Sequence, residues 1–204
     1  MVVADILRCL GGFELAGFID DSSPERWGRP YFGSTILGGQ EQFPSLLATG
    51  VSNLIVGIGD CAARMKLAAT AKARGFQLAS AIHPRSTIAR DVPVGEGTAI
   101  LAGSVINAAA SVGANAIINS CASVDHECVI EDGVHLSPGV RLGGKVRICR
   151  GAWLALNVAV APGVTIGAGT IVGAGSIVLS DLPPNVLAFG APAKAQRELS
   201  PAKA

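Results

Sequence analysis

The sequence is poor in the residues that most folds and many binding surfaces depend on. Aromatic residues make up only 4% of the chain and charged residues 15%, and the net charge is +1. So small a net charge leaves no electrostatic footprint for nucleic acid or for an anionic membrane surface. Aromatic rings dominate the core of a conventional globular domain. Their scarcity predicts a narrow interior filled by Ile, Val and Ala.

The spacing of the cysteines is typical of neither a zinc site nor a redox motif. The five cysteines form no CxxC pair. Cys128 falls at a position expected to point into the core, where it would act as a small apolar residue. Cys121 lies near His126 in the sequence, so a catalytic thiol at Cys121 stays open as a second interpretation.

Long uncharged stretches are present, but they do not predict membrane spans. No charged residue lies between Glu96 and Asp125, or between Arg150 and Asp181. Either stretch could cross a bilayer by length, yet both carry Gly, Asn and Pro at regular intervals. The first ten residues include Asp5 and lack the apolar segment of a signal peptide. We therefore expect no membrane span and a cytoplasmic location.

The strongest pattern in the chain is a period of six from residue 88 to residue 178. Neither the 3.6-residue period of a helix nor the two-residue period of a strand explains it, whereas a short fixed repeat is typical of a solenoid. Every position in this column is Ile, Val or Leu: Ile88, Val94, Ile100, Ile106, Val112, Ile118, Val124, Ile130, Leu136, Leu142, Ile148, Leu154, Val160, Ile166, Val172 and Val178.

Two further columns indicate how each hexad folds. Four residues after each aliphatic residue stands a mostly small or β-branched residue, which suits a narrow interior. One position earlier, twelve of sixteen residues are Gly, Asn or Asp, which tolerate a left-handed backbone. Each hexad is therefore a short strand that ends in a corner. Three hexads close a triangular coil, and coils stack at the ~4.8 Å strand spacing. The sequence predicts a parallel β-helix of about five coils over residues 84–185, followed by a C-terminal tail, residues 186–204.

Residues 1–83 have the pattern of a small α/β unit. Helices are predicted over residues 2–10, 41–48 and 61–74, the last of them capped by Asp60. Strands are predicted over residues 15–20, 53–59 and 77–82, and the middle one reads as buried because its apolar run is unbroken. Alternating strands and helices favour a parallel sheet of the doubly wound, Rossmann-like type. Arg64, on the third helix, is expected to be structural.

The repeat resembles that of the hexapeptide-repeat acyltransferases, whose β-helix is left-handed. The handedness is implied by this resemblance alone, because ordinary crossover connections are right-handed. Over nearly its whole length the sequence is similar to bacterial acetyltransferases that modify nucleotide-linked amino sugars or sialic acid. The resemblance implies an enzyme that uses acetyl-CoA as co-substrate, holds no bound cofactor or metal, and assembles as a homotrimer.

Four residues carry the resemblance at the expected catalytic centre. The family's spacing of an Asn, a His followed by an acid, and a second His is matched by Asn119, His126, Glu127 and His135. His126 and Glu127 fall at a predicted corner, so a buried core histidine is not expected. A histidine with an ordinary pKa near 6.5 can take the proton that a sugar amine must lose. Glu127 is expected to orient the imidazole, with Asp125 as its substitute.

The resemblance also implies the residues that hold the two substrates. Backbone amides near residues 143–144 are expected to stabilise the oxyanion, and Asn119 is expected to contact the acceptor. The resemblance assigns acetyl-CoA binding to His135, Gly144, Leu156, Ala174 and Lys194, and it places Lys194 near a CoA phosphate. It assigns binding of the nucleotide-linked sugar to Asp20, Asp21 and Gly59.

Compared with the family, the sequence lacks a first strand and the Gly-rich loop that holds nucleotide phosphates at a helix N-terminus. If the protein starts at Met1, the unit before residue 80 is expected to be the less stable part and to bind the acceptor weakly.

Three other functions stay open. A sugar or sialic acid O-acetyltransferase would use the same histidine base. A non-catalytic scaffold would keep the β-helix without turnover. A trimeric zinc hydratase would need more ligands than His126 and His135 supply.

Overall fold

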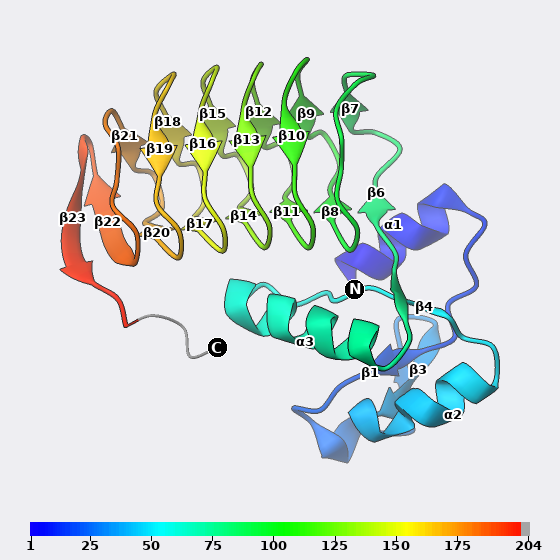
Figure 1. Cartoon of the computed structure of the whole chain (residues 1–204). Helices are drawn as coiled ribbons and strands as arrows, with labels where there is room; N and C mark the ends of the chain where they lie inside the picture. The colour runs from blue at the N-terminus through cyan, green and yellow to red at the C-terminus, as the bar shows by residue number, and fades with distance from the viewer. Residues whose placement is uncertain (201–204) are drawn as a thin grey trace.

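The protein consists of a small α/β unit beside a long β-helix, as Figure 1 shows for the computed structural model. The structure describes residues 1–200. Helix α3 (Cys61–Ala73) lies along one side of the β-helix, and the smaller sheets lie beyond it. No helix within the described part of the chain is long and apolar enough to cross a membrane.

The predicted coil of three hexads is confirmed by the strand pairing. Each coil strand from β7 to β18 pairs in parallel with the strand eighteen residues later, as Ile117 does with His135 and Ser123 with Arg141. The coil strands are β7 (Thr87–Ile88), β8 (Ala99–Ile100), β9 (Val105–Ile106), β10 (Ser111–Val112), β11 (Ile117–Ile118), β12 (Ser123–Val124), β13 (Val129–Ile130), β14 (His135–Leu136), β15 (Arg141–Leu142), β16 (Arg147–Ile148), β17 (Trp153–Leu154), β18 (Ala159–Val160), β19 (Thr165–Ile166), β20 (Ile171–Val172) and β21 (Ile177–Val178).

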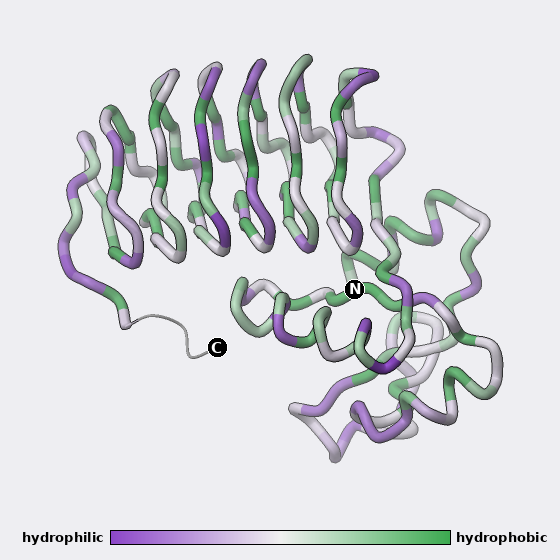
Figure 2. The backbone as a smooth tube through the Cα atoms, viewed as in Figure 1, coloured by the Kyte–Doolittle hydropathy of each residue, from purple (hydrophilic) through white to green (hydrophobic). Residues whose placement is uncertain are grey.

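These strands form the three faces of a triangular prism. One sheet contains β8-β11-β14-β17-β20 in that order, a second runs β7-β9-β12-β15-β18-β21, and a third β10-β13-β16-β19. The aliphatic column is buried inside from Ile100 to Val178, and each such side chain contributes about 1.5–3 kcal/mol by leaving water. Figure 2 shows hydrophobic residues recurring in every coil. The core is therefore a thin aliphatic column, as the composition predicts.

The corners adopt the left-handed backbone that the third column predicts. All fourteen corner residues from position 97 to position 175 have positive φ. Ten of the fourteen are Gly or Asn, and the four exceptions are Ala109, Cys121, Glu127 and Lys145.

The strands at both ends of the β-helix extend beyond the predicted limits. β6 (Ala81–Ile82) already pairs with β8, and β22 (Val186–Gly190) pairs with β20. β22 then turns back through a hairpin into β23 (Ala193–Glu198). The domain boundaries at residues 83 and 185 stay predictions. However, β6 before the first boundary and β22 after the second both belong to one sheet of the β-helix.

The N-terminal unit has the expected α/β character, with shorter strands than predicted. Two small sheets form, β1-β3-β2 and β4-β5, and β1–β3 and β4–β5 are parallel pairs. The elements are α1 (Val2–Leu10), β1 (Phe18–Ile19), η1 (Pro24–Arg26), β2 (Pro30–Tyr31), β3 (Ser34–Gly38), η2 (Gln40–Gln42), α2 (Phe43–Ala48), β4 (Asn53–Leu54), α3 and β5 (Gln77–Leu78).

Two strand predictions need correction. The run 53–59 is not one buried strand, because only its first two residues pair, with β5, and the rest has no strand partner among residues 1–200. Its apolar side chains, such as Val56, pack instead into the hydrophobic core of the N-terminal unit. The run 77–82 divides into β5 and β6, which join different sheets. β2 and β3 were not predicted.

The two units are joined by the buried guanidinium of Arg64, which is fully inaccessible to solvent. Its Nε donates to the Asn115 carbonyl at 2.8 Å, and one Nη donates to the Gly133 carbonyl at 2.7 Å. The other Nη donates to the carbonyls of Ile58 and Gly59. Arg64 thus joins the start of α3 to two stacked corners of the β-helix, in agreement with its expected structural role.

Replacing Arg64 by Met should detach the N-terminal unit from the β-helix. The substitution leaves buried carbonyls without donors, so we expect a loss of about 3–5 kcal/mol in the stability of that unit. Trp27 lies in the N-terminal unit and Trp153 in the β-helix. During denaturation, tryptophan fluorescence therefore reports on the N-terminal unit in a Trp153→Phe background and on the β-helix in a Trp27→Phe background. The exposed Arg74→Met is the matched control. An unchanged Trp27 transition in Arg64→Met would contradict this role.

Candidate active site

His126 and Glu127 form an exposed pair at the corner between β12 and β13. Their side chains are 55% and 51% exposed, so the prediction that His126 is not a core residue is confirmed. The His126 Nδ1 lies 3.0 Å from the Glu127 Oε2. Because a carboxylate only accepts, Nδ1 carries the proton, and in the neutral ring Nε2 is left with a free lone pair. That nitrogen is the one able to accept a proton.

Glu127 occupies a backbone conformation that an acidic residue rarely adopts. Its φ is 58°, as its place in the corner column predicts. A left-handed backbone costs a non-Gly residue roughly 1 kcal/mol. Such strain collects at functional sites, where the surrounding structure holds the residue in place.

Gly144 lies directly against the imidazole from the next coil. A Cβ built on Gly144 would lie 2.5 Å from the His126 Nε2, so only glycine allows this ring position. The Gly143 amide donates to the Val160 carbonyl within the ladder and is not free for an oxyanion. The Gly144 amide has no acceptor among the described residues, which leaves it as the candidate donor of this pair.

Asp125 contacts the backbone of His126, not its ring. Its carboxylate accepts from the His126 amide at 2.7 Å and from the Asn107 side chain at 2.9 Å. These two hydrogen bonds, the one from Asn107 foremost, hold the pKa of Asp125 below its usual range. Asp125 is therefore an anion that shapes the corner, and Glu127 is the acid that reaches the imidazole.

His135 lies on a different face, in a half-buried position on β14. Its Nδ1 lies 3.1 Å from the Gly59 carbonyl, so Nδ1 is protonated, and its Nε2 lies 3.4 Å from the Asn119 amide nitrogen. The ring stacks on Trp153 with 6.2 Å between centroids. Burial lowers the pKa of His135, and the Gly59 carbonyl opposes this effect. His135 is thus a fixed neutral ring at pH 7.

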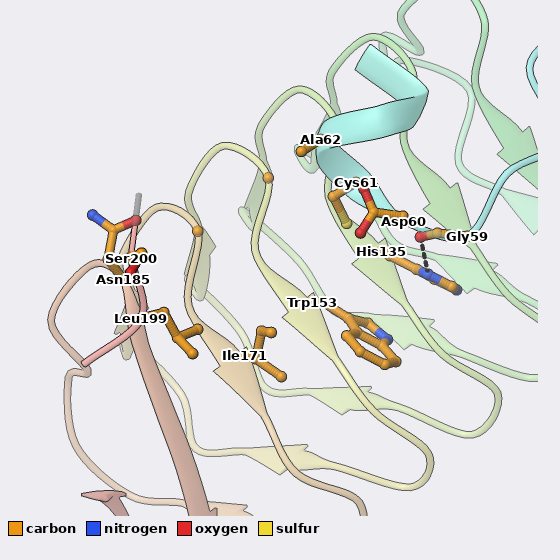
Figure 3. A pocket seen from close by; sticks show the side chains of 12 residues that line it. Gly59, Asp60, Cys61, Ala62, His135, Trp153, Ile171, Asn185, Leu199 and Ser200 are labelled. Carbon is orange, nitrogen blue, oxygen red and sulfur yellow. Dashed lines mark hydrogen bonds between the residues drawn. The ribbon is translucent and has the colours of Figure 1, made fainter. Parts of the chain in front are cut away.

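A pocket of about 650 Å³ opens in front of His135, between the start of α3 and the β-helix (Figure 3). Gly59 and Asp60 line it from the N-terminal unit, and Trp153 and Ile171 line it from the sheet. The structure therefore brings Gly59, Asn119 and His135 together across long sequence separations. His126 does not line this pocket, so the two histidines lie at separate places on one chain.

The other predicted acetyl-CoA contacts fall at two corners and one hairpin. Gly144 lies at the corner of His126. Leu156 and Ala174 are exposed and stack on adjacent coils at the corner that follows β17 and β20. Lys194 is exposed on β23, opposite Phe189. A single chain does not gather these residues into one cavity.

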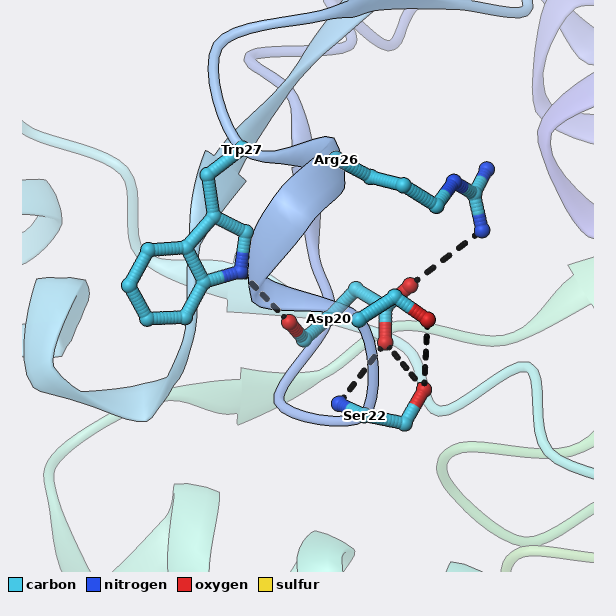
Figure 4. Close-up of polar contacts among 5 residues, drawn as sticks. Asp20, Ser22, Arg26 and Trp27 are labelled. Atoms are coloured by element: carbon cyan, nitrogen blue, oxygen red, sulfur yellow. Dashed lines mark hydrogen bonds and ion pairs between the residues drawn. The ribbon is translucent and has the colours of Figure 1, made fainter.

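Asp20 and Asp21 are both engaged within the N-terminal unit. The Asp20 carboxylate accepts from the Ser22 hydroxyl at 2.6 Å and pairs with Arg26, while its backbone carbonyl accepts from Trp27 (Figure 4). The Ser22 hydroxyl bond is the main cause that lowers the pKa of Asp20. Asp21 accepts from the backbone and side chain of Gln40. The two acids order the segment after β1.

Lys145 is the residue at this site that the sequence analysis missed. It stands one coil after Glu127 in the corner column, and its Nζ lies 3.7 Å from the Glu127 Oε2. A lysine among glycines and asparagines in that column is the signal that could have identified it. Within residues 1–200 no cluster of His, Cys, Asp and Glu is arranged to hold a metal ion.

Comparisons with known proteins agree with this fold. Residues 1–71 match the family model described as the PglD N-terminal domain. The structure is similar to perosamine N-acetyltransferase from Caulobacter crescentus, solved with CoA and GDP-perosamine, at 42% identity and a TM-score of 0.92, over 97% of this chain and 91% of that chain. A comparison with curated proteins gives no match.

A second relative is the acetyltransferase domain of PglB from Neisseria gonorrhoeae, solved with acetyl coenzyme A. It is 30% identical with a TM-score of 0.89, over 96% of this chain and 93% of that chain. WeeI from Acinetobacter baumannii, at 23% identity and a TM-score of 0.77 over 88% of this chain and 85% of that one, shows the fold alone. The chain belongs to the hexapeptide-repeat nucleotide-sugar N-acetyltransferase family. The expected left-handed β-helix with an α/β start is thereby confirmed.

Replacing Gly144 by Ala should displace the His126 ring without unfolding the protein. The new methyl would overlap Nε2, while the φ of Gly144 lies outside the left-handed range, so its backbone conformation does not require glycine. We expect acetyl transfer to fall about 10- to 100-fold if His126 is the base. Gly57→Ala, whose methyl would meet only Val3 at 3.9 Å, is the control. Equal rates for the two variants would show that this ring position is not needed.

Proposed function

We propose that this protein transfers the acetyl group of acetyl-CoA directly to the amino group of a nucleotide-linked 4-amino sugar. The observation that carries the proposal is the His126–Glu127 pair, with Nδ1 held by the carboxylate and Nε2 free at an exposed corner. The relatives solved with CoA, acetyl coenzyme A and GDP-perosamine support both substrate classes. A GDP-linked sugar is the first acceptor to test.

In this mechanism His126 acts as the general base and no acyl-enzyme forms. The amine nitrogen attacks the thioester carbonyl, and the His126 Nε2 takes the proton that the amine loses. Glu127 holds the ring and stabilises the imidazolium. The C–S bond then breaks, and the imidazolium returns the proton to the departing thiolate. The Gly144 amide is the candidate donor to the oxyanion.

The alternative functions are less well supported. An O-acetyltransferase would use the same base, but the relative with 42% identity is named an N-acetyltransferase of perosamine. A non-catalytic scaffold gains nothing from a strained Glu127, since Gly or Asn would serve the corner at lower cost.

We also propose that the protein works as a homotrimer in the cytoplasm. His126 and the His135 pocket lie apart on one chain, so neighbouring copies are needed to place both beside one acetyl-CoA. Exposed apolar side chains on the faces, such as Val105 and Ile177, suit such packing. All five cysteines are free, which suits a reducing compartment.

Loss of the base should abolish most of the activity. For His126→Ala we expect a fall of roughly 10²–10⁴ in kcat with acetyl-CoA and GDP-perosamine, because the amine keeps its proton. Glu127→Gln should cost less, because the ring keeps a partner. Thiol release measures the rate, and circular dichroism checks the fold. Wild-type kcat in His126→Ala across the pH range would refute the base assignment.

Trp153 provides a probe of the proposed trimer. It is 40% exposed on a face of the prism, and we expect it to lie at or near a contact between copies. Light scattering should give three times the chain mass for the wild type and a weaker trimer for Trp153→Ser. A monomer at micromolar concentration would rule the assembly out.

A further inference from the structure

Lys145 occupies a corner that disfavours a lysine. Its φ is 62°, and ten of the fourteen corners in this column are Gly or Asn. Three of the four exceptions, Ala109, Glu127 and Lys145, stack on one edge of the prism, the edge that carries His126. A left-handed backbone at a lysine costs roughly 1 kcal/mol, and such strained residues cluster at functional sites.

The side chain of Lys145 reaches the same oxygen that holds the imidazole. Its Nζ lies 3.7 Å from the Glu127 Oε2, and that oxygen lies 3.0 Å from the His126 Nδ1. The Lys145 amide also donates to the His126 carbonyl at 2.9 Å. Lys145 is therefore attached to the pair through both its backbone and its side chain.

The ion pair alone does not explain why a lysine stands here. Lys145 is 65% exposed and Glu127 51%, and exposed pairs contribute little to stability. Asn or Gly would relieve the strained backbone and stabilise the corner at least as well. The role of the charge must therefore be sought in the chemistry of the neighbouring histidine.

We propose that Lys145 is a positioning residue that keeps His126 unprotonated at lower pH. This inference rests on the proposed function, in which the neutral ring is the base. Within residues 1–200, the charged side chains that contact His126 or its partner Glu127 are the carboxylates of Asp125 and Glu127 and the ammonium of Lys145. The two carboxylates favour the imidazolium, and the ammonium opposes it. Without Lys145 the imidazolium forms at higher pH, and the base is lost there.

Three substitutions separate the charge of Lys145 from its place in the fold. Lys145→Asn removes the charge and suits the left-handed corner, so it should fold at least as well as the wild type. Lys145→Met removes the charge and keeps the strain, and Lys145→Arg keeps both. Arg150→Gln is the matched control, because Arg150 pairs with Asp132 at 3.5 Å on another edge of the same coil.

The decisive measurement is an NMR titration of the His126 ring in the substrate-free protein at low ionic strength. We expect its midpoint to move up by about 0.5 pH unit in Lys145→Asn and Lys145→Met, and to stay in place in Lys145→Arg and Arg150→Gln. High salt should shrink the shift, because the groups are exposed. The acidic limb of the kcat/KM profile should move by the same amount.

A midpoint in Lys145→Asn that coincides with that of the wild type would overturn this inference. The titration needs no substrate, so it decides the role of Lys145 independently of turnover. Absence of acetyl transfer by the wild type would instead refute the proposed function. The two failures are therefore distinguishable.

Discussion

The structure depends on one constraint, that the chain turns through a left-handed corner at every sixth residue. Because each corner stacks on the corner eighteen residues later, any side chain placed there lies above its counterpart in the next coil. Glycine and asparagine satisfy the constraint at low cost. The His126 edge departs from this rule, and there the stacking sets Glu127 against Lys145 and His126 against Gly144. The regularity that builds the core thus also aligns the candidate catalytic groups.

The N-terminal unit is attached to the β-helix by hydrogen bonds as well as by packing. Arg64 inserts a charged group among backbone carbonyls from the loop before α3 and from the corners at Asn115 and Gly133. No carboxylate in the described part of the chain pairs with it. Met65 fills the space beside Gly133. The carbonyl bonds position the start of α3, which in turn places the Gly59 carbonyl on His135.

The two histidines show how environment divides one residue type into two roles. His135 is half-buried, bonded at both nitrogens and stacked on Trp153, so its protonation and orientation are fixed. His126 is exposed, bonded at one nitrogen only, and surrounded by two carboxylates and an ammonium. A fixed neutral ring suits the binding of a substrate, and a ring with a free lone pair suits proton transfer.

The sequence by itself determined the β-helix, because a six-residue repeat admits few other structures and each hexad carries its own core and corner residues. The same periodicity placed His126 and Glu127 at an exposed corner and predicted the left-handed backbone of Glu127. It could not supply the short strands of the N-terminal unit, since residues 53–59 and 77–82 are apolar runs whose pairing depends on which neighbours are available. Only the tertiary structure brought Gly59 to His135 and Arg64 to the corners, because these contacts depend on how the N-terminal unit docks on the β-helix, which local pattern does not encode. The repeat stacks Lys145 on Glu127, but the reach of the two side chains decides their contact.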